Sequence, residues 1–246
     1  MEQRQLSRHY SGHCLGFNFD SALLDQLTTT YGIQMNSIDL PVKRGRGRPP
    51  KSSRQFSDTR AELIKSGLEL LTENGFISSG IDTIVKNVSV PKGSFYYYFK
   101  SKEDFGYAVL SAYGGYFAHK LDKHLTNCAF SPLNRLENFV NDAKAGMAKY
   151  QFKRGCLVGN LMQESPQLSE ALTTHLQNIL REWQQRVSHC LSEAKISNQI
   201  AENADNDKLA SLFWSGWEGA VMRAKLYKST EPLDEFWNYF SGSIKK

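Results

Sequence analysis

The segment from Pro91 to Lys100 carries the kinds of side chain that bind a nucleic acid. Phe95 and Phe99 are four residues apart, so in a helix they share one buried face. The other side chains offer hydrogen-bond donors on several further sides, where a purely structural helix would be mostly aliphatic. This pattern favours a helix that enters the major groove of DNA. The alternative is an aromatic packing helix whose tyrosine hydroxyls merely reach solvent.

Each polar group of this segment suits a different part of a DNA duplex. Lys92 and Ser94, near the start of the helix, can reach base edges, and Gly93 lets the backbone approach closely. Phosphates can be bound by the ammonium group of Lys102 and by three tyrosine hydroxyls, which fixes register without selecting a sequence. The tyrosines are Tyr96, Tyr97 and Tyr98.

A basic block precedes this segment and contains no acidic residue. Its cationic members are Lys43, Arg44, Arg46, Arg48, Lys51 and Arg54. The sequence Arg-Gly-Arg-Pro within it is similar to the core of an AT-hook, an arm that lays two arginines along a narrow minor groove. Arg46 and Arg48 are therefore candidate DNA contacts. A solvated basic linker is the alternative.

The second half of the chain holds a thiol that could sense a small molecule. Gly155 can cap a helix, which would place Cys156 in the first turn, where the helix dipole and two neighbouring cations favour a thiolate. A thiolate can add to an α,β-unsaturated carbonyl or be oxidised to sulfenic acid. The alternative is a buried thiol that only fills space. We assign that role to the other cysteines, Cys14, Cys128 and Cys190.

A stripe of residues near the C-terminus could line a ligand site. Its members recur at steps of three and four and share one helix face: Trp214, Trp217, Glu218, Val221 and Lys225. A lysine on a buried face needs a partner, which the Cys156 thiolate or a ligand oxygen could provide. Otherwise Lys225 extends to solvent. Trp183 either lines the same cavity or fills the core.

The elements that position these residues are predicted to be helices throughout. Apolar spacing predicts a first helix that Ser57 or Asp58 caps and Gly75 ends. A short helix over 81–88 is followed by a tight turn and a second short helix that starts near Pro91. Further helices are predicted over 102–125, which Ser101 caps, and over 132–150, 156–164, 167–195, 205–227 and 231–243.

The sequence predicts an all-α protein of two domains behind an N-terminal extension. Residues 1–42 show no sustained period and are expected to be weakly ordered, with Met35 as a second candidate translation start. Residues 43–56 form the basic arm and 57–103 a three-helix helix-turn-helix domain. Residues 104–246 form a helical domain for ligand binding and dimerisation.

Residues 57–104 resemble the DNA-binding domain of the TetR/AcrR family of repressors. The matching motifs are Gly75-Phe76, Ile81-x-x-Ile84, Val90 to Phe99 and Lys102-Glu103-Asp104. The chain departs from the family where Gly80 replaces a threonine and Pro91 replaces a serine or threonine cap. The resemblance implies that DNA is contacted by Lys92, Gly93, Tyr96, Tyr97, Tyr98 and Lys102.

Two later segments resemble one branch of that family, which contains the regulator of acrylate utilisation and the repressor of N-ethylmaleimide reductase. They are Arg154–Leu161 and Phe213–Lys225. The resemblance implies a response to reactive, electron-poor small molecules, with Cys156 and Lys225 at the sensing positions. It also implies a homodimer formed by the last two helices, and hence a palindromic operator.

We therefore expect a ligand-responsive repressor that binds double-stranded operator DNA. No phosphate loop, nucleophile elbow or metal-ligand spacing points to an enzyme, a cofactor or a metal site. No apolar run predicts a membrane partner, and cytoplasmic localisation is expected. The alternative function is a DNA-architectural or activator protein without a small-molecule switch.

Overall fold

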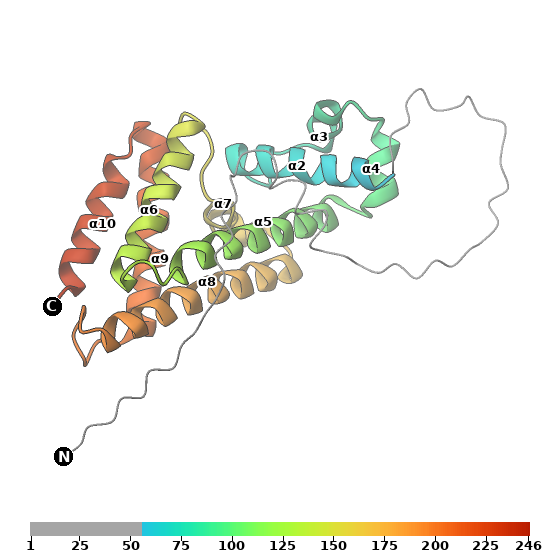
Figure 1. Ribbon diagram of the computed structural model, residues 1–246. Coiled ribbons are helices and arrows are strands. Elements are labelled where there is room, and N and C mark those ends of the chain that lie inside the picture. The colour runs from blue at the N-terminus through green and yellow to red at the C-terminus, as the bar shows by residue number, and fades with distance from the viewer. Residues whose placement is uncertain (1–55) are drawn as a thin grey trace, which may run out of the picture. The chain divides into compact units, whose positions relative to one another are not determined.

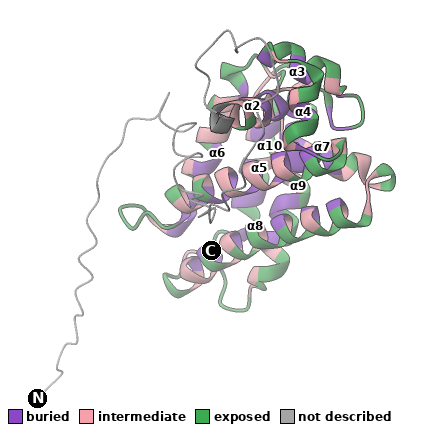
Figure 2. Ribbon diagram, turned by 90° about the vertical axis from the view of Figure 1, so that its right-hand side faces the viewer, coloured by how far each residue is buried: buried purple, intermediate pink, exposed green. Residues whose placement is uncertain are grey.

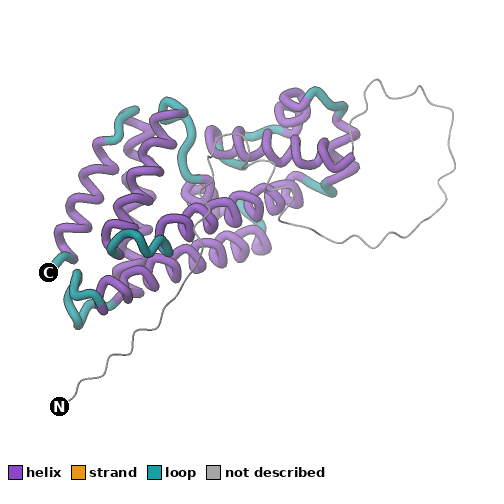
Figure 3. Tube along the Cα trace, in the orientation of Figure 1, coloured by secondary structure: helices purple, strands orange, loops and turns teal. Residues whose placement is uncertain are grey.

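In the computed structural model the described part of the chain runs from residue 56 to residue 246. The N-terminal extension and the arm with Arg46 and Arg48 lie outside it and stay predictions. Over the described residues the chain is helical without a strand, as Figure 3 shows, which confirms the all-α class. The elements are α2 (Phe56–Asn74), α3 (Ile81–Val88), α4 (Lys92–Tyr98), α5 (Lys102–Leu125), α6 (Pro132–Lys149), α7 (Leu157–Glu164), the 3-10 turn η1 (Ser165–Gln167), α8 (Glu170–Ile196), α9 (Asn206–Tyr227) and α10 (Glu231–Ile244).

The helices α2, α3 and α4 form the predicted helix-turn-helix (Figure 1). Leu63, Ile84 and Phe95 come from the three helices and are fully buried, so each helix covers the apolar face of the others. Gly75 ends α2 in the left-handed region, at φ 84°, as the sequence predicts. Ser89 makes the turn between α3 and α4 with φ 57°, an unusual conformation for a residue with a side chain.

Two helix starts differ from the prediction. The helix α2 is already formed at Phe56, so Ser57 and Asp58 lie inside it instead of capping it. Pro91 occupies the cap position of α4 rather than the first turn, with ψ 149°. Proline fixes only φ, so it can adopt the extended backbone of a cap, and its carbonyl accepts the Ser94 amide at 2.8 Å.

The helix α5 carries the chain from the DNA-binding module into the C-terminal domain. It starts as predicted, because the Ser101 hydroxyl accepts the amide N–H of Asp104 at 3.0 Å. The carboxylate of Asp104 accepts the amide of Lys100 at 2.9 Å, one residue before the partner of an ordinary capping box. α5 is 24 residues long, so one rigid rod belongs to both parts.

The C-terminal domain is a helical bundle with an aromatic centre. α8 packs between α5 and α9, while α10 packs on α9 and α6 (Figure 1). The rings of Trp183 and Trp214 lie 5.2 Å apart, and Phe213 stacks on Trp217 at 6.1 Å. Figure 2 shows the buried faces turned inward between the helices. Large aromatic side chains dominate the burial energy of this core.

The short helix α7 lies where the two parts meet and contacts α2, α5 and α8. The sequence predicts the end of α7 at residue 164 correctly. The predicted start of α8 at residue 167 is wrong, because η1 continues from α7 and Ser169 caps α8 by accepting the Leu172 amide. The other predicted bounds agree with the observed helices to within about two residues, the ordinary uncertainty of helix ends.

Candidate DNA-binding and sensing sites

The surface of α4 presents aromatic hydroxyls above a rigid aromatic base. Phe95 and Phe99 are buried and pack against Phe105 of α5, with ring centroids 5.2 and 5.0 Å away. Tyr97 is 72 % exposed and Tyr96 52 % exposed. The predicted division into a buried phenylalanine face and a polar face is thus present. Side chains on so short a helix can point into a groove only if the helix itself is held firmly.

The start of α4 is exposed to solvent. A Cβ added at Gly93 would meet no atom of the described residues within 4 Å. Lys92 is exposed and pairs with Asp82 of α3 at 2.8 Å. Its hydrogen bond and charge interaction with Asp82 raise the pKa of Lys92, so the ammonium form is favoured. The pair joins α3 to α4 and keeps the cation at the end of α4 that is predicted to reach bases.

Lys102 has an additional structural role that the sequence did not predict. Its ammonium group donates to the carbonyl of Ile77 at 3.0 Å and lies 4.7 Å from the centre of the Phe76 ring. Partial burial lowers its pKa. Lys102 therefore ties the loop after α2 to the first turn of α5, while its contact with phosphate stays a prediction.

Cys156 has surroundings opposite to those predicted. It occupies the cap position of α7, one residue before the first turn, and is 7 % exposed. Burial and the nearby carboxyl of Glu218 raise the pKa of its thiol well above the ordinary value. The neighbouring cation Arg154 pairs with Glu73 at 3.0 Å instead of with the sulfur. The expectation of a stabilised thiolate is therefore wrong, and Cys156 is a protonated thiol.

Glu218 is a buried acid in this domain. It is 4 % exposed, and neither carboxylate oxygen has a hydrogen-bond partner of ordinary geometry among the described residues. Burial raises its pKa to about 7, and the Cys156 thiol opposes this shift to a smaller extent. Gly159 of α7 lies against the carboxylate, because a Cβ there would collide with Oε2. The fold thus brings Glu218 and Cys156 together, as their place in the predicted sensing site requires.

Tyr113 of α5 completes this buried group and is not among the residues predicted from the sequence. Burial and then the Cys156 sulfur raise the pKa of Tyr113 well above its ordinary value, and Glu218 acts in the same direction. Its ring lies 6.1 Å from that of Trp183. Trp183, Trp214 and Trp217 are each at most 2 % exposed and form the adjoining core. The signal in the sequence that could have identified Tyr113 is a tyrosine at a position of the predicted 102–125 helix that faces the core.

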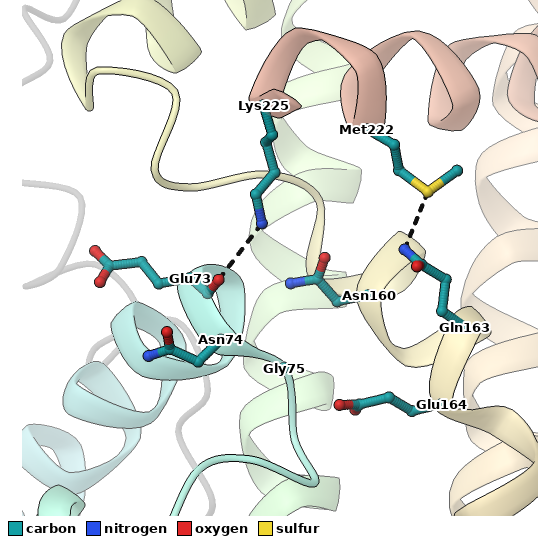
Figure 4. A pocket seen from close by; sticks show the side chains of 8 residues that line it. All are labelled: Glu73, Asn74, Gly75, Asn160, Gln163, Glu164, Met222 and Lys225. Carbon is teal, nitrogen blue, oxygen red and sulfur yellow. Dashed lines mark hydrogen bonds between the residues drawn. The ribbon is translucent and has the colours of Figure 1, made fainter. Parts of the chain in front are cut away.

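Lys225 has a partner other than the two predicted. Its ammonium group donates to the backbone carbonyls of Thr72 and Glu73 at 3.4 and 3.5 Å, at the end of α2. Figure 4 shows the contact with Glu73. The last carbonyls of a helix have no partner within it and attract cations. Burial lowers the pKa of Lys225. Because of this contact, Lys225 neither pairs with Cys156 nor simply extends into solvent.

Two residues of α7 hold the same end of α2. Glu164 accepts the amides of Phe76 and Ile77 at 2.8 and 3.2 Å. The side-chain amide of Asn160 donates to the carbonyls of Leu71 and Thr72, both at 3.0 Å. We call Asn160, Glu164 and Lys225 the α2 clasp. They line a surface pocket of about 330 Å³ together with Gln163 and Met222, as Figure 4 shows.

The α2 clasp could not be found from sequence spacing, because its partners are up to 153 residues apart. It connects the two predicted sites through one element. Cys156 precedes the first residue of α7, Glu164 is its last residue, and the helix is only eight residues long. A small displacement of α7 therefore reaches both the buried acid and the end of α2.

Within residues 56–246, no group of histidine, cysteine and acidic side chains is placed to hold a metal ion. No helix in that range combines the length and the apolar character needed to cross a bilayer. A helix-turn-helix with an exposed polar helix, joined to a helical domain with a buried polar site, defines a ligand-regulated DNA-binding protein.

Comparison with known proteins gives the family. Residues 63–107 match the model of bacterial regulatory proteins of the tetR family, and residues 132–240 match the tetracyclin repressor-like C-terminal domain. The chain belongs to the TetR family of bacterial transcription regulators.

Individual relatives confirm the predicted branch. The chain is 44 % identical to the transcriptional regulator AcuR of Cereibacter sphaeroides, over 82 % of this chain and 91 % of AcuR. A TetR regulatory protein of Rhodobacter sphaeroides has a similar structure, with a TM-score of 0.74 and 44 % identity over 76 % of this chain and 98 % of that one. The reduced form of NemR from Escherichia coli has a TM-score of 0.69 and 27 % identity over 77 % of this chain and 98 % of NemR.

Proposed function

We propose that this protein is a repressor whose dimer binds a palindromic operator and releases it when a small α,β-unsaturated inducer occupies the site around Cys156 and Glu218. The observation that carries this proposal is the position of α7. This helix has the sensing residue Cys156 at its start and the clasp residue Glu164 at its end. Relatives named as repressors, DhaR and NemR, share the family.

The DNA contacts of the proposal follow from the surface of α4. Lys92 and Ser94 contact base edges, Gly93 allows close approach, and phosphates are bound by Lys102 and by the hydroxyls of Tyr96, Tyr97 and Tyr98. Arg46 and Arg48 of the basic arm enter the adjacent minor groove. The exposed rings of Tyr96 and Tyr97 and the exposed cation Lys92 on one short helix support this assignment.

In the proposed homodimer, the outer faces of α9 and α10 form the interface between the two protomers. Several large apolar side chains are exposed there, which is costly on an isolated surface: Leu212, Leu226, Tyr227 and Tyr239. A twofold interface on these helices places the two α4 helices roughly one DNA turn, about 34 Å, apart.

Release follows when the inducer favours the arrangement that cannot bind DNA. An inducer at the Cys156 and Glu218 site displaces α7, which moves the α2 clasp, and also bears on α5 through Tyr113. Both elements set the position of the helix-turn-helix. Because the Cys156 thiol is protonated, reversible binding comes first. An adduct then forms when the sulfur bonds to the terminal alkene carbon and the thiol proton passes to the adjacent carbon.

The test measures DNA release and protein mass on the same samples. Purified native protein and Cys156→Ser are titrated with acrylate, N-ethylmaleimide and hydrogen peroxide while bound to fluorescent promoter DNA. The proposal predicts release from a palindromic site by at least one electrophile, with a matching mass increase that Cys156→Ser lacks. A binding profile without a palindrome, unaffected by every compound, would instead establish an architectural protein.

A further inference from the structure

An acidic side chain lies on the part of the helix-turn-helix that is proposed to face DNA. Asp82 is the second residue of α3, and its side chain is 78 % exposed. It lies beside Lys92, the first residue of α4, whose side chain is 52 % exposed. DNA is a polyanion, so a carboxylate at this position opposes the attraction that binds every duplex. The proposed DNA contacts leave the presence of Asp82 unexplained.

Asp82 and Lys92 form a two-point contact that joins the starts of α3 and α4. The ammonium nitrogen of Lys92 lies 2.8 Å from one carboxylate oxygen of Asp82 and 3.1 Å from the other. An ammonium group has three N–H donors. Two acceptor oxygens therefore leave at least one N–H of Lys92 for a group of the DNA.

The stability of the fold does not account for this contact. An ion pair between exposed side chains contributes little, because water screens the charges and both side chains lose conformational freedom. A carboxylate in the first turn of α3 is favourable there with or without Lys92. The effect of the contact on Lys92 is larger, since the hydrogen bond with Asp82 and then its charge raise the pKa of Lys92.

We infer that Asp82 is a positioning residue that sets sequence selectivity, because it makes Lys92 bind a base edge instead of a phosphate. An unpaired lysine is a point charge on a flexible stem, which binds any phosphate within its reach. The Asp82 carboxylate offsets that charge and holds the ammonium group at the start of α4. This inference rests on the proposed function and adds to it a residue that determines which operator is bound.

The difference between phosphates and bases follows from how each interaction depends on charge. Binding to phosphates is driven by net positive charge and the release of counterions, so a neutralising carboxylate weakens it. A hydrogen bond to a base edge is short and directional and needs only a correctly placed N–H. The remaining donor of Lys92 suits guanine, which has two adjacent acceptors in the major groove.

Removal of the carboxylate should therefore tighten binding to DNA in general while selectivity is lost. In Asp82→Asn, Lys92 keeps its charge, gains freedom and binds phosphates of any sequence. A damaged helix-turn-helix would behave differently, because it would bind every duplex more weakly. The direction of the change thus separates a positioning role from a structural one.

The experiment compares full-length native protein with Asp82→Asn by fluorescence anisotropy on two duplexes of equal length. One duplex is the sequence that the native protein enriches from a random pool, and the other is a random sequence. In about 0.15 M salt, Asp82→Asn is predicted to bind the random duplex about 10-fold more tightly and the enriched duplex with little change. The ratio of the two affinities then falls about 10-fold.

Salt dependence gives a second measure on the same samples. For the random duplex, the slope of log affinity against log salt should steepen by about 2 in Asp82→Asn. Each protomer of the dimer gains one phosphate contact through Lys92, and each contact contributes about 0.9 to the slope. The melting temperature should stay within about 4 °C of the native value, as expected for an exposed pair.

Two matched variants separate positioning from charge. Glu103→Gln removes the same charge from the first turn of α5, so it should raise the affinity for both duplexes alike and keep their ratio within about twofold. Asp82→Glu keeps the carboxylate and should retain most of the native selectivity.

A third comparison tests whether Asp82 acts through Lys92. On duplexes changed at single base pairs, Asp82→Asn and Lys92→Ala should lose discrimination at the same position of each half-site. In the Lys92→Ala background, Asp82→Asn should cause no further loss of discrimination, since the residue through which it acts is gone.

Three results would overturn the inference. One is an affinity ratio of Asp82→Asn within about twofold of the native ratio, and another is an equal fall in Glu103→Gln. The third is a ratio that falls only because the enriched duplex is bound more weakly. In each case a native protein that enriches one sequence keeps the proposed function. If the native protein enriches no sequence, the proposed function fails together with this inference.

Discussion

At the scale of single residues, the two sites obtain their chemistry in different ways. Tyr97 and Lys92 are exposed, and the pair that Lys92 forms with Asp82 keeps it in the ammonium form expected of a lysine at a surface. Cys156 and Glu218 are buried, and their environment changes which protonation state they hold. The exposure of the predicted DNA contacts could therefore be anticipated from the sequence, whereas the protonation state of the predicted sensing residues could not. Glu218 is 62 positions from Cys156, and no local pattern reveals that the acid lies against the thiol.

The first prediction concerns the reactivity of Cys156. Because its pKa is raised and the thiolate is the nucleophile, alkylation of Cys156 by iodoacetamide should accelerate about tenfold per pH unit between pH 7 and pH 9. Exposed Cys128 provides the internal comparison and should be alkylated first at pH 7. Peptide mass mapping over time measures both. Equal alkylation rates for the two cysteines at pH 7 would show that burial does not lower the reactivity of the Cys156 thiol.

A second prediction concerns the contact between α7 and α9. Gly159→Ala places a Cβ against the Glu218 carboxylate and should destabilise the protein by about 1 to 3 kcal/mol through overpacking. It should also weaken operator binding without inducer, because it pushes α7 as the inducer does. Thermal unfolding and fluorescence anisotropy measure the two effects.

The control for Gly159→Ala is Gly146→Ala in α6, where the added Cβ meets only the tip of Lys120 at 4.0 Å. This variant should be stabilised by up to about 1 kcal/mol, because glycine is unfavourable within a helix. Tighter operator binding by Gly159→Ala than by native protein would contradict the role given to α7.

At the scale of elements, most of the helices follow from local spacing and caps. Ser101, Gly75 and Ser131-Pro132 mark their helix ends because capping and backbone preferences act over a few residues. The function of α7 does not follow from its own sequence. Its importance comes from contacts with Phe76, 88 positions from Glu164, and such contacts exist only after folding.

The third prediction tests α7 as the connecting element. Glu164→Gln keeps the size of the side chain but turns one acceptor into a donor that faces the amides of Phe76 and Ile77. We expect a loss of about 1 to 3 kcal/mol in unfolding free energy. We also expect the inducer to reduce the operator affinity of this variant less than it reduces that of the native protein. Calorimetric unfolding and anisotropy titration measure these quantities.

Glu202→Gln, an exposed change in the loop between α8 and α9, is the matched control for Glu164→Gln. It should alter stability by no more than about 0.5 kcal/mol. A full inducer response in Glu164→Gln would show that the signal passes through α5 alone.

At the scale of the whole molecule, we propose that affinity and selectivity come from different parts of the chain. In this proposal the basic arm adds positive charge to a module that selects sequence, and counterion release makes such charge measurable as salt dependence. Arg46→Ala with Arg48→Ala should reduce the slope of log affinity against log salt by about 2, since each phosphate contact contributes about 0.9. Lys245→Ala with Lys246→Ala removes the same charge at the C-terminal end. An equal reduction in that control would mean that the arm acts only through net charge.

The central claim is that α4, repeated by twofold symmetry, selects the operator sequence. Its most direct test is Lys92→Ala combined with Tyr97→Ala, assayed by competition between operator and random DNA. Both side chains are exposed, so the free energy of unfolding and inducer binding should change little. Selectivity should fall about 100-fold, because the two Lys92 base contacts of the dimer are lost at about 1 to 3 kcal/mol each. Loss of the Tyr97 phosphate contact should lower the affinity for operator and random DNA alike. Undiminished preference for the operator in this variant would contradict the account.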